Sequence, residues 1–150
     1  MMAWAQAIID SLEAALHREL PDSSRISVLI TLSREYQYTN INRSRELAEN
    51  ALKIAETKNS RKQKIRAYQN IGALYAISGD YSTALRYDNL ALQNSLEARD
   101  SANLSMDYNN VANDYYDLGE YDDAYFNFTQ SFRVAKSIGD SLRMAIALHN

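Results

Sequence analysis

The chain repeats itself with a period of 40 residues, and this period constrains its fold more than any other feature. The segment AYQNIGALYAISGDYSTALRYDNLALQ, which begins at Ala67, aligns with DYNNVANDYYDLGEYDDAYFNFTQSF, which begins at Asp107. Seven positions then carry the same or a similar residue in one register, among them Tyr75 with Tyr115. A further step of 40 places Asn150 in the same series. Such a repeat is typical of arrays in which each unit packs against its neighbours.

Each repeat has the spacing of two helices joined by a tight turn. Apolar side chains recur three and four positions apart up to Gly79, and the same period resumes at Tyr81. Gly79 and its equivalent Gly119 suit the left-handed conformation that ends a helix. The acidic residue after each glycine places negative charge near the start of the second helix. Because no strand pattern is visible, we predict an all-α fold, an α-solenoid of stacked antiparallel helix pairs.

Composition and charge exclude several classes of function. With 150 residues and 46% hydrophobic residues, the chain has the ordinary mixture of one soluble domain. A net charge of −3 gives no general attraction to phosphate, and the basic run from Arg61 to Arg66 fits a solvated helix start, so we predict no nucleic-acid partner. Polar residues interrupt the N-terminal apolar run, so we predict no membrane insertion by this segment. The compartment stays open between cytoplasm and periplasm.

Catalytic and metal-binding patterns are also missing from the sequence. The chain has no cysteine, which excludes thiol catalysis and cysteine-bound zinc. His17 and His149 lie in different elements, with no carboxylate at metal-ligand spacing, and no glycine-rich phosphate loop occurs. We therefore predict that the chain is not an enzyme and that it holds no metal or other cofactor.

One tetrapeptide matches a known catalytic motif. Gly139-Asp140-Ser141-Leu142 reads as the GDSL signature of a family of serine esterases, with Ser141 as nucleophile. A shift of 40 residues places this tetrapeptide at Arg99-Asp100-Ser101-Ala102, the junction between two repeats. Gly139 then ends one helix, and Asp140 or Ser141 caps the next. A serine esterase is kept only as a remote alternative.

The repeats resemble tetratricopeptide (TPR) repeats, and the resemblance covers about residues 25–150. The family pattern of small and aromatic residues is met in two repeats at Gly72, Tyr75, Gly79, Tyr81 and Ala84, and at Ala112, Tyr115, Gly119, Tyr121 and Ala124. The period of 40 exceeds the usual 34 and is similar to the long-helix TPRs of kinesin light chains and bacterial Rap-type regulators. The resemblance implies a right-handed superhelix.

The same resemblance divides the chain into a capping segment and an array. Residues 1–24 are expected to form a capping helix and a turn, with an apolar stripe at Trp4, Ile8, Leu12, Leu16 and Leu20. Residues 25–60 form a degenerate repeat, 61–100 and 101–140 form two clear ones, and 141–150 begin another. In the degenerate repeat Ser33 and Ser44 take the positions of small residues, and Asn40 stands in for the turn glycine. Pro21 is expected to end the capping helix.

Asp88 departs from the pattern, because it occupies the position of Phe128 and Ala48 in the other repeats. Two interpretations are open. Either Tyr87 supplies the packing and Asp88 faces solvent, or the carboxylate is partly buried with a partner. The first interpretation is favoured, because an unpaired buried charge is costly.

The resemblance places function on a concave face lined by the first helix of each pair. In the family, an asparagine two positions before the small residue often holds the backbone of an extended peptide, and Asn70 and Asn110 match it. An amide suits this task because it both donates and accepts a hydrogen bond. The other residues expected on this face are Arg34, Gln37, Tyr38, Arg66, Gln69, Asn109, Asn113, Tyr116 and Asp117. The alternative is that the asparagines only brace neighbouring helices.

The resemblance therefore implies a non-catalytic module that binds a protein or an extended peptide segment. The lead-in IIDSLEAALHRELPDSSRISVLITLSREY is similar to the stretch before TPR arrays in bacterial sensor histidine kinases and related signalling proteins. This similarity implies a sensory or docking region of a larger protein. The alternative is a structural module that self-associates through its C-terminal edge, where Leu142, Ile146 and Leu148 belong to a helix without a partner.

Overall fold

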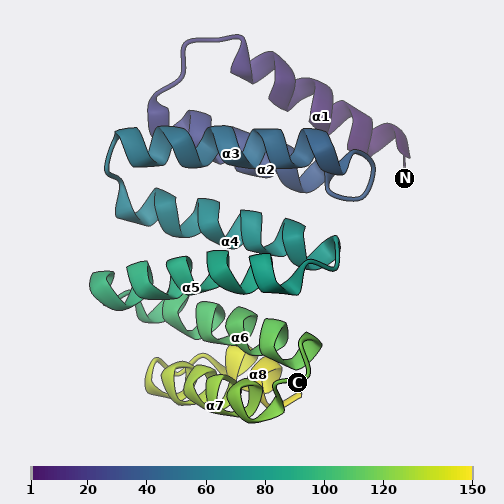
Figure 1. Ribbon diagram of the computed structural model, residues 1–150. Coiled ribbons are helices and arrows are strands. Elements are labelled where there is room, and N and C mark those ends of the chain that lie inside the picture. The colour runs from purple at the N-terminus through teal and green to yellow at the C-terminus, as the bar shows by residue number, and fades with distance from the viewer. Residues whose placement is uncertain (1, 150) are drawn as a thin grey trace. The chain divides into compact units, whose positions relative to one another are not determined.

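The computed structural model describes the backbone of residues 2–149 and the side chains of residues 6–149 (Figure 1). This described part contains eight helices and no strand, so the predicted all-α class is confirmed. Contacts divide the chain into two compact units, Met1–Leu74 and Tyr75–Asn150. The side chain of Trp4 and the whole of Asn150, both named in the sequence predictions, lie outside the described residues.

The first unit is built from three helices and most of a fourth. These helices are α1 (Met2–Leu16), α2 (Asp22–Tyr36), α3 (Ile41–Thr57) and α4 (Arg61–Ile77), the last up to Leu74. α2 packs against both α1 and α3. The core of the first unit is a cluster of aliphatic side chains, which includes Ile9, Ile26, Ile30, Leu32 and Leu47.

Two buried serines bring α2 and α3 close together. Ser33 and Ser44 are fully buried, and the Ser44 hydroxyl donates to the Ser33 carbonyl oxygen at 2.5 Å. The two hydroxyl oxygens lie 3.1 Å apart. A larger side chain at either position would separate the helices, because interiors are packed without spare room. The degenerate repeat therefore has the close helix contact that its small residues predict.

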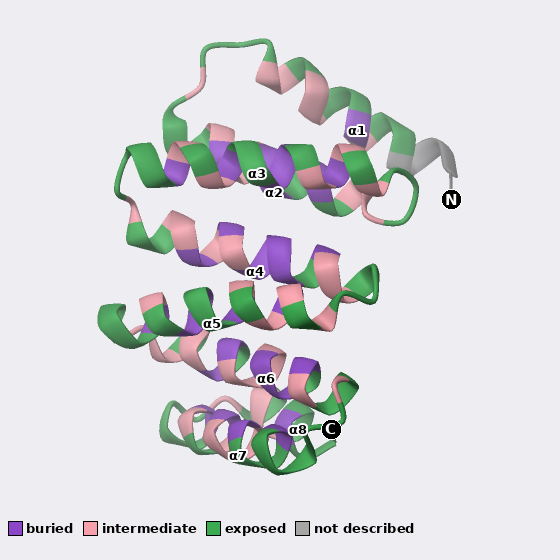
Figure 2. Cartoon of the chain, in the orientation of Figure 1, coloured by how far each residue is buried: buried purple, intermediate pink, exposed green. Residues whose placement is uncertain are grey.

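The second unit continues the same arrangement. It holds the end of α4 together with α5 (Tyr81–Ala98), α6 (Ser101–Asp117), α7 (Tyr121–Ser137) and α8 (Ser141–His149). α6 packs against α5 and α7, and α8 packs against α7 and more lightly against α6. The buried positions lie along the inner faces of these helices (Figure 2). Ser105 and Ser131 exchange hydroxyl-to-carbonyl bonds between α6 and α7 at 3.2 and 2.8 Å.

The turns between helices form as the glycines predict. Gly79, Gly119 and Gly139 all have positive φ, at 77°, 81° and 69°. In this region a side chain is strained, so glycine ends each helix at low cost. Asp80 and Asp140 then cap the helices that follow, each accepting a backbone N–H three residues on, at 3.1 and 3.0 Å.

Ser141 is the first residue of α8 and lies directly after the capping aspartate. Its side chain is exposed; Gly139 and Asp140 lie in the turn between α7 and α8, and Ser141 and Leu142 begin α8. The prediction that Asp140 or Ser141 caps the helix is confirmed, with Asp140 as the capping residue.

Three predictions on the first unit are wrong. α1 ends at Leu16, so Leu20 lies in the connection and not on the predicted apolar stripe. Pro21 does not end α1, because it is the N-cap residue of α2. Asn40 does not replace the turn glycine, because its φ is −151° and its side chain caps α3 by accepting the Arg43 N–H at 3.0 Å. Asparagine is a preferred N-cap residue, and this preference decides its place here.

We predict that Asp140→Ala lowers the melting temperature by a few degrees and speeds amide hydrogen exchange in α8, because the helix loses its cap. Ser141→Ala should change neither quantity, since the serine is exposed and does not cap. An ester-hydrolysis assay on the wild type and Ser141→Ala completes the experiment. Hydrolysis that disappears in Ser141→Ala would revive the esterase alternative.

Candidate functional site

In the first unit, Asn70 joins two helices and is almost completely buried, at 3% exposed. Its amide nitrogen donates to the Ser33 hydroxyl at 2.7 Å, and its amide oxygen accepts from Nε of Arg34 at 3.3 Å. Both ends of the amide are therefore used between α4 and α2. These contacts match the bracing alternative for Asn70, and its contact with a peptide stays a prediction.

The neighbouring predicted residues of this unit differ in exposure. Arg66 donates to the hydroxyl of Ser27 at 3.0 Å and to the side-chain oxygen of Gln63 at 3.3 Å. Gln69 is buried, at 7% exposed. Desolvation and the nearby positive charge of Arg66 lower the pKa of Arg34, so two guanidinium groups lie close together.

The end of α2 contributes the remaining predicted residues of this unit. Gln37 is half-buried, whereas Tyr38 is largely exposed. This face therefore presents an aromatic side chain beside polar and positively charged groups.

In the second unit, the predicted residues lie along α6. Asn110 and Asn109 are half-buried, and Asn110 donates a hydrogen bond to the Asp88 carboxyl. Asn113, Tyr116 and Asp117 are exposed. Because Tyr116 and Asp117 lie three and four positions after Asn113, both lie on the same side of the helix as Asn113.

Asp88 is buried, which makes the favoured interpretation of its position wrong. The side chain is 3% exposed and lies beside Asp114, which is buried to the same extent. Tyr87 instead stacks on Tyr75, with ring centroids 5.7 Å apart. The second interpretation, a buried carboxyl with a partner, is the one observed. The partner is a second carboxyl and the amide of Asn110, which the repeat pattern alone did not reveal.

The two buried carboxyls hold a proton between them. Burial raises the pKa of Asp88 to about 9, and the charge of Asp114 and a hydrogen bond to it act in the same direction. Burial also raises the pKa of Asp114, to about 6, while the hydrogen bond from Asp88 opposes that rise. The proton therefore resides on Asp88 at neutral pH. One oxygen of each carboxyl, Asp88 Oδ1 and Asp114 Oδ2, is buried without a hydrogen-bond partner among the described residues.

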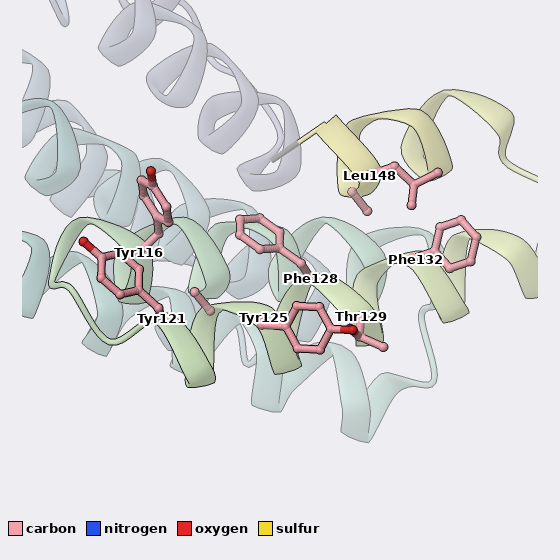
Figure 3. A pocket seen from close by; sticks show the side chains of 9 residues that line it. Tyr116, Tyr121, Tyr125, Phe128, Thr129, Phe132 and Leu148 are labelled. Carbon is pink, nitrogen blue, oxygen red and sulfur yellow. The ribbon is translucent and has the colours of Figure 1, made fainter.

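An aromatic pocket of about 500 Å³ lies in the second unit, where α6, α7 and α8 meet (Figure 3). Its lining residues are Tyr116, Tyr121, Ala124, Tyr125, Phe128, Thr129, Phe132, Ala147 and Leu148. The rings of Tyr116 and Tyr121 meet edge to face, with centroids 5.5 Å apart. Tyr121 and Tyr125 are 63% and 76% exposed, so much of the aromatic surface faces solvent.

Sequence reasoning missed most of this pocket. Of the predicted site residues only Tyr116 lines it, because the family pattern assigns Tyr121 to the spacing of the repeat and not to the concave face. A signal was present, since aromatics recur at positions 121, 125, 128 and 132, which lie on one face of a helix. A periodic stripe does not say whether another helix covers it, and this one is partly open.

A second, smaller pocket lies at the start of α8. Its volume is about 260 Å³, and its lining includes Met106, Asn109, Leu142 and Ile146. Asn109 therefore lies beside apolar side chains of α8. The polar residues in its lining are Asn109, Arg143 and two serines.

Metal-holding groups were sought throughout the part of the chain that the structure describes. No cluster of three or more His, Cys, Asp or Glu side chains occurs there. None of the helices traced between residues 2 and 149 combines the length and the apolar character needed to cross a bilayer.

We predict that the second unit becomes less stable as pH rises from about 4 to about 9, because the folded pKa of Asp88, about 9, lies above the unfolded value of about 3.9. The folded state then binds more protons than the unfolded chain throughout this window. Urea unfolding should show a loss of at least about 1 kcal/mol between pH 5.5 and 8.5.

Asp88→Asn should flatten this dependence and stabilise the chain at pH 8.5, because the amide still donates to Asp114 and has no proton to lose. The exposed Asp122→Asn serves as a control that keeps the wild-type slope. Equal slopes in wild type and Asp88→Asn would contradict the shared proton.

Comparison with known proteins shows similarity in fold and not in sequence. No protein-family model and no curated protein matches this chain. The TPR domain of Arabidopsis FLU aligns with a TM-score of 0.71 and 16% identity, over 78% of this chain and 99% of that one. The apo form of RapI aligns with a TM-score of 0.79 and 20% identity, over 92% of this chain.

Two further solved structures show the same arrangement. A Rap protein complexed with Competence and Sporulation Factor aligns with a TM-score of 0.80 and 17% identity over 95% of this chain. BtubC from P. vanneervenii gives 0.79 and 18% over 97%. The chain spans 40% of RapI, 42% of the complexed Rap protein and 60% of BtubC. The predicted α-solenoid is thus confirmed, and the chain has the fold of a TPR-like helical repeat.

Proposed function

We propose that the chain is a non-catalytic module that binds an extended segment of a partner protein. The observation that carries this proposal is one face of α6, on which the side chains of Asn113, Tyr116 and Asp117 are exposed to solvent. Exposed amide and aromatic side chains of this kind provide hydrogen bonds and contact area at a recognition surface. They follow Ala112, which is fully buried, so this helix separates its packing face sharply from its open face.

The first unit supports the proposal with the equivalent positions of α2. Arg34, Gln37 and Tyr38 follow the buried Ser33 at the same spacing. In α4 the equivalent positions are Ala73, Ala76 and Ile77, which offer no polar group. Recognition in the proposal is therefore assigned to the faces of α2 and α6.

The asparagines Asn70 and Asn110 have a more demanding role in this proposal. Each amide must release an internal partner before it bonds a peptide backbone, Arg34 for Asn70 and Asp88 for Asn110. Leaving a buried partner unpaired costs free energy. We therefore assign the first contacts to the exposed side chains, with Arg66, Gln69 and Asn109 as their supporting neighbours.

The larger setting is also part of the proposal. One solved neighbour is a Rap protein in complex with Competence and Sporulation Factor, which agrees with a helical-repeat module that binds a partner. We place the chain as the sensory or docking region of a bacterial signalling protein. A binding assay on the isolated chain tests the binding role without reference to this setting.

We expect Asn113→Ala combined with Tyr116→Ala to weaken the binding of a peptide selected from a random library roughly tenfold or more. Each lost contact contributes on the order of 1 kcal/mol to the binding free energy. Binding is measured by isothermal titration, and the melting temperature should change little because both side chains are exposed. Asn89→Ala, an exposed asparagine on α5, is the matched control and should bind normally. A selected ligand with unchanged affinity for the double variant would remove these residues from the site.

Self-association is a second candidate function, favoured by the exposed apolar side chains of α8. Leu142 and Leu148 are 71% and 72% exposed, and Ile146 is 42% exposed. Leu142 and Ile146 lie four positions apart and share one helix face, and exposed apolar surface of this kind is typical of an interaction site.

We expect sedimentation of the wild type at increasing concentration to show growing mass, and Leu142→Gln with Ile146→Gln to suppress it. The physical reason is the apolar area that leaves water when two such faces meet. Arg133→Gln, an exposed polar change on α7, is the control. A chain that stays monomeric at all concentrations, with α8 fully protected from hydrogen exchange, would exclude this function.

A further inference from the structure

The aromatic pocket of the second unit combines an apolar floor with open tyrosine rings. Phe128 and Phe132 are half-buried and form its floor, whereas Tyr121, Tyr125 and Leu148 are mostly exposed (Figure 3). A pocket lined by open aromatic rings offers both apolar area and the negative face of each ring. A ligand that uses both would carry an apolar stem and a positive charge.

An acidic hollow adjoins the pocket and shares one of its residues. This hollow has a volume of about 360 Å³ and is lined by Gly119, Glu120, Tyr121, Asp122 and Asp123. Tyr121 thus lies in both cavities. Asp117, exposed at the end of α6, adds another carboxylate close to the same turn. The pocket therefore has a negatively charged rim along one side.

The sequence around the pocket contains no compensating positive charge. Between Arg99 and Arg133 the chain has seven acidic residues and no lysine or arginine. Arg133 comes directly after Phe132, at the far end of the pocket from the acidic turn. The negative charge at the turn between α6 and α7 therefore has no lysine or arginine in the surrounding stretch of residues 100–132.

We propose that this pocket binds a basic segment of a protein partner, with lysine or arginine side chains lying over the tyrosine rings and facing the acidic rim. The inference rests on the proposed function and specifies the chemistry of the partner. A cation over a tyrosine face is attracted by the ring, and the attraction increases when water is partly excluded. The aliphatic stem of lysine or arginine covers the apolar floor in the same pose.

Other partners fit the pocket less well. An apolar segment would bring the rim carboxylates out of water with no opposite charge, which is costly. An acidic segment or a nucleic acid would meet like charge at the turn. Charge complementarity therefore selects a basic segment.

A second copy of the chain also carries a basic run, but that run is already engaged. It lies at the start of α4, where two of its residues are held: Arg66 donates to Ser27 and Lys64 donates to Asn59. These bonds hold the side chains within the first unit. A segment whose lysines and arginines are free of such contacts is the better occupant.

The test uses the whole chain and a labelled peptide of alternating arginine and glycine, ten residues long. Peptides of the same length with glutamine or glutamate in place of arginine give the neutral and acidic comparisons. Fluorescence anisotropy should detect binding of the arginine peptide that weakens as salt increases. The glutamine peptide should bind much more weakly, and the glutamate peptide should not bind.

Tyr121→Leu combined with Tyr125→Leu should weaken the binding of the arginine peptide roughly tenfold, because the side chains stay apolar while two ring faces are lost. Phe126→Leu is the matched control, since Phe126 is an exposed aromatic of α7 outside the pocket. Asp122→Asn with Asp123→Asn should weaken binding and reduce its salt dependence. Glu49→Gln, an exposed acidic residue of α3, should do neither.

Four outcomes would overturn the inference. Equal affinity of the wild type and the double tyrosine variant would show that the rings take no part. A dimer in the absence of peptide that disappears in that variant would assign the pocket to a second copy. Library ligands that depend on Asn113, with no binding of the arginine peptide, would remove this inference and keep the proposed function. The absence of any protein ligand would remove both.

Discussion

Close contact between paired helices at small buried residues is the constraint on which the rest of the structure depends. In the first unit Ser33 and Ser44 meet between α2 and α3, and in the second Ser105 and Ser131 meet between α6 and α7. The hydroxyls of Ser44, Ser105 and Ser131 each donate to a carbonyl oxygen of the facing helix, and the Ser33 hydroxyl accepts from the Asn70 amide, so the polar atoms are satisfied where the backbones approach. Because the paired helices lie so close together at these serines, a large side chain has no room between them. Aromatic residues must therefore pack at the flanks of each pair.

This division of space explains why the second unit has so much open aromatic surface. Buried alanines fill the inside of the α6–α7 pair, whereas the tyrosines and phenylalanines of α7 lie outside it. The same argument applies to Asp88, which occupies a position filled by Ala48 and Phe128 in other repeats. A shared proton makes the buried carboxyl tolerable, because two ionised carboxylates in contact would repel each other. Equivalent inner positions of the repeats can thus hold side chains as different as alanine, phenylalanine and aspartate.

Much of the fold could be predicted from local chemistry. Gly79, Gly119 and Gly139 each end a helix because only glycine adopts positive φ without strain, and Asp140 caps because its side chain reaches the backbone three residues on. The errors arose where local rules allowed two outcomes. Asn40 suits both a left-handed turn and an N-cap, and the structure uses it as a cap. The candidate site was predicted less well, because helical periodicity separates faces and does not say which face a neighbour covers.

The sequence by itself determined the helix pairs, their 40-residue period, their turns and caps, and the all-α class, because these depend on spacing and on the conformational preferences of single residues. Only the tertiary structure decided that Asn70 is buried between α2 and α4 and that Asp88 meets Asp114. It also decided that the aromatic stripe of α7 opens into a pocket. These outcomes depend on contacts between side chains that are distant along the chain, and a repeat pattern carries no information on such distances.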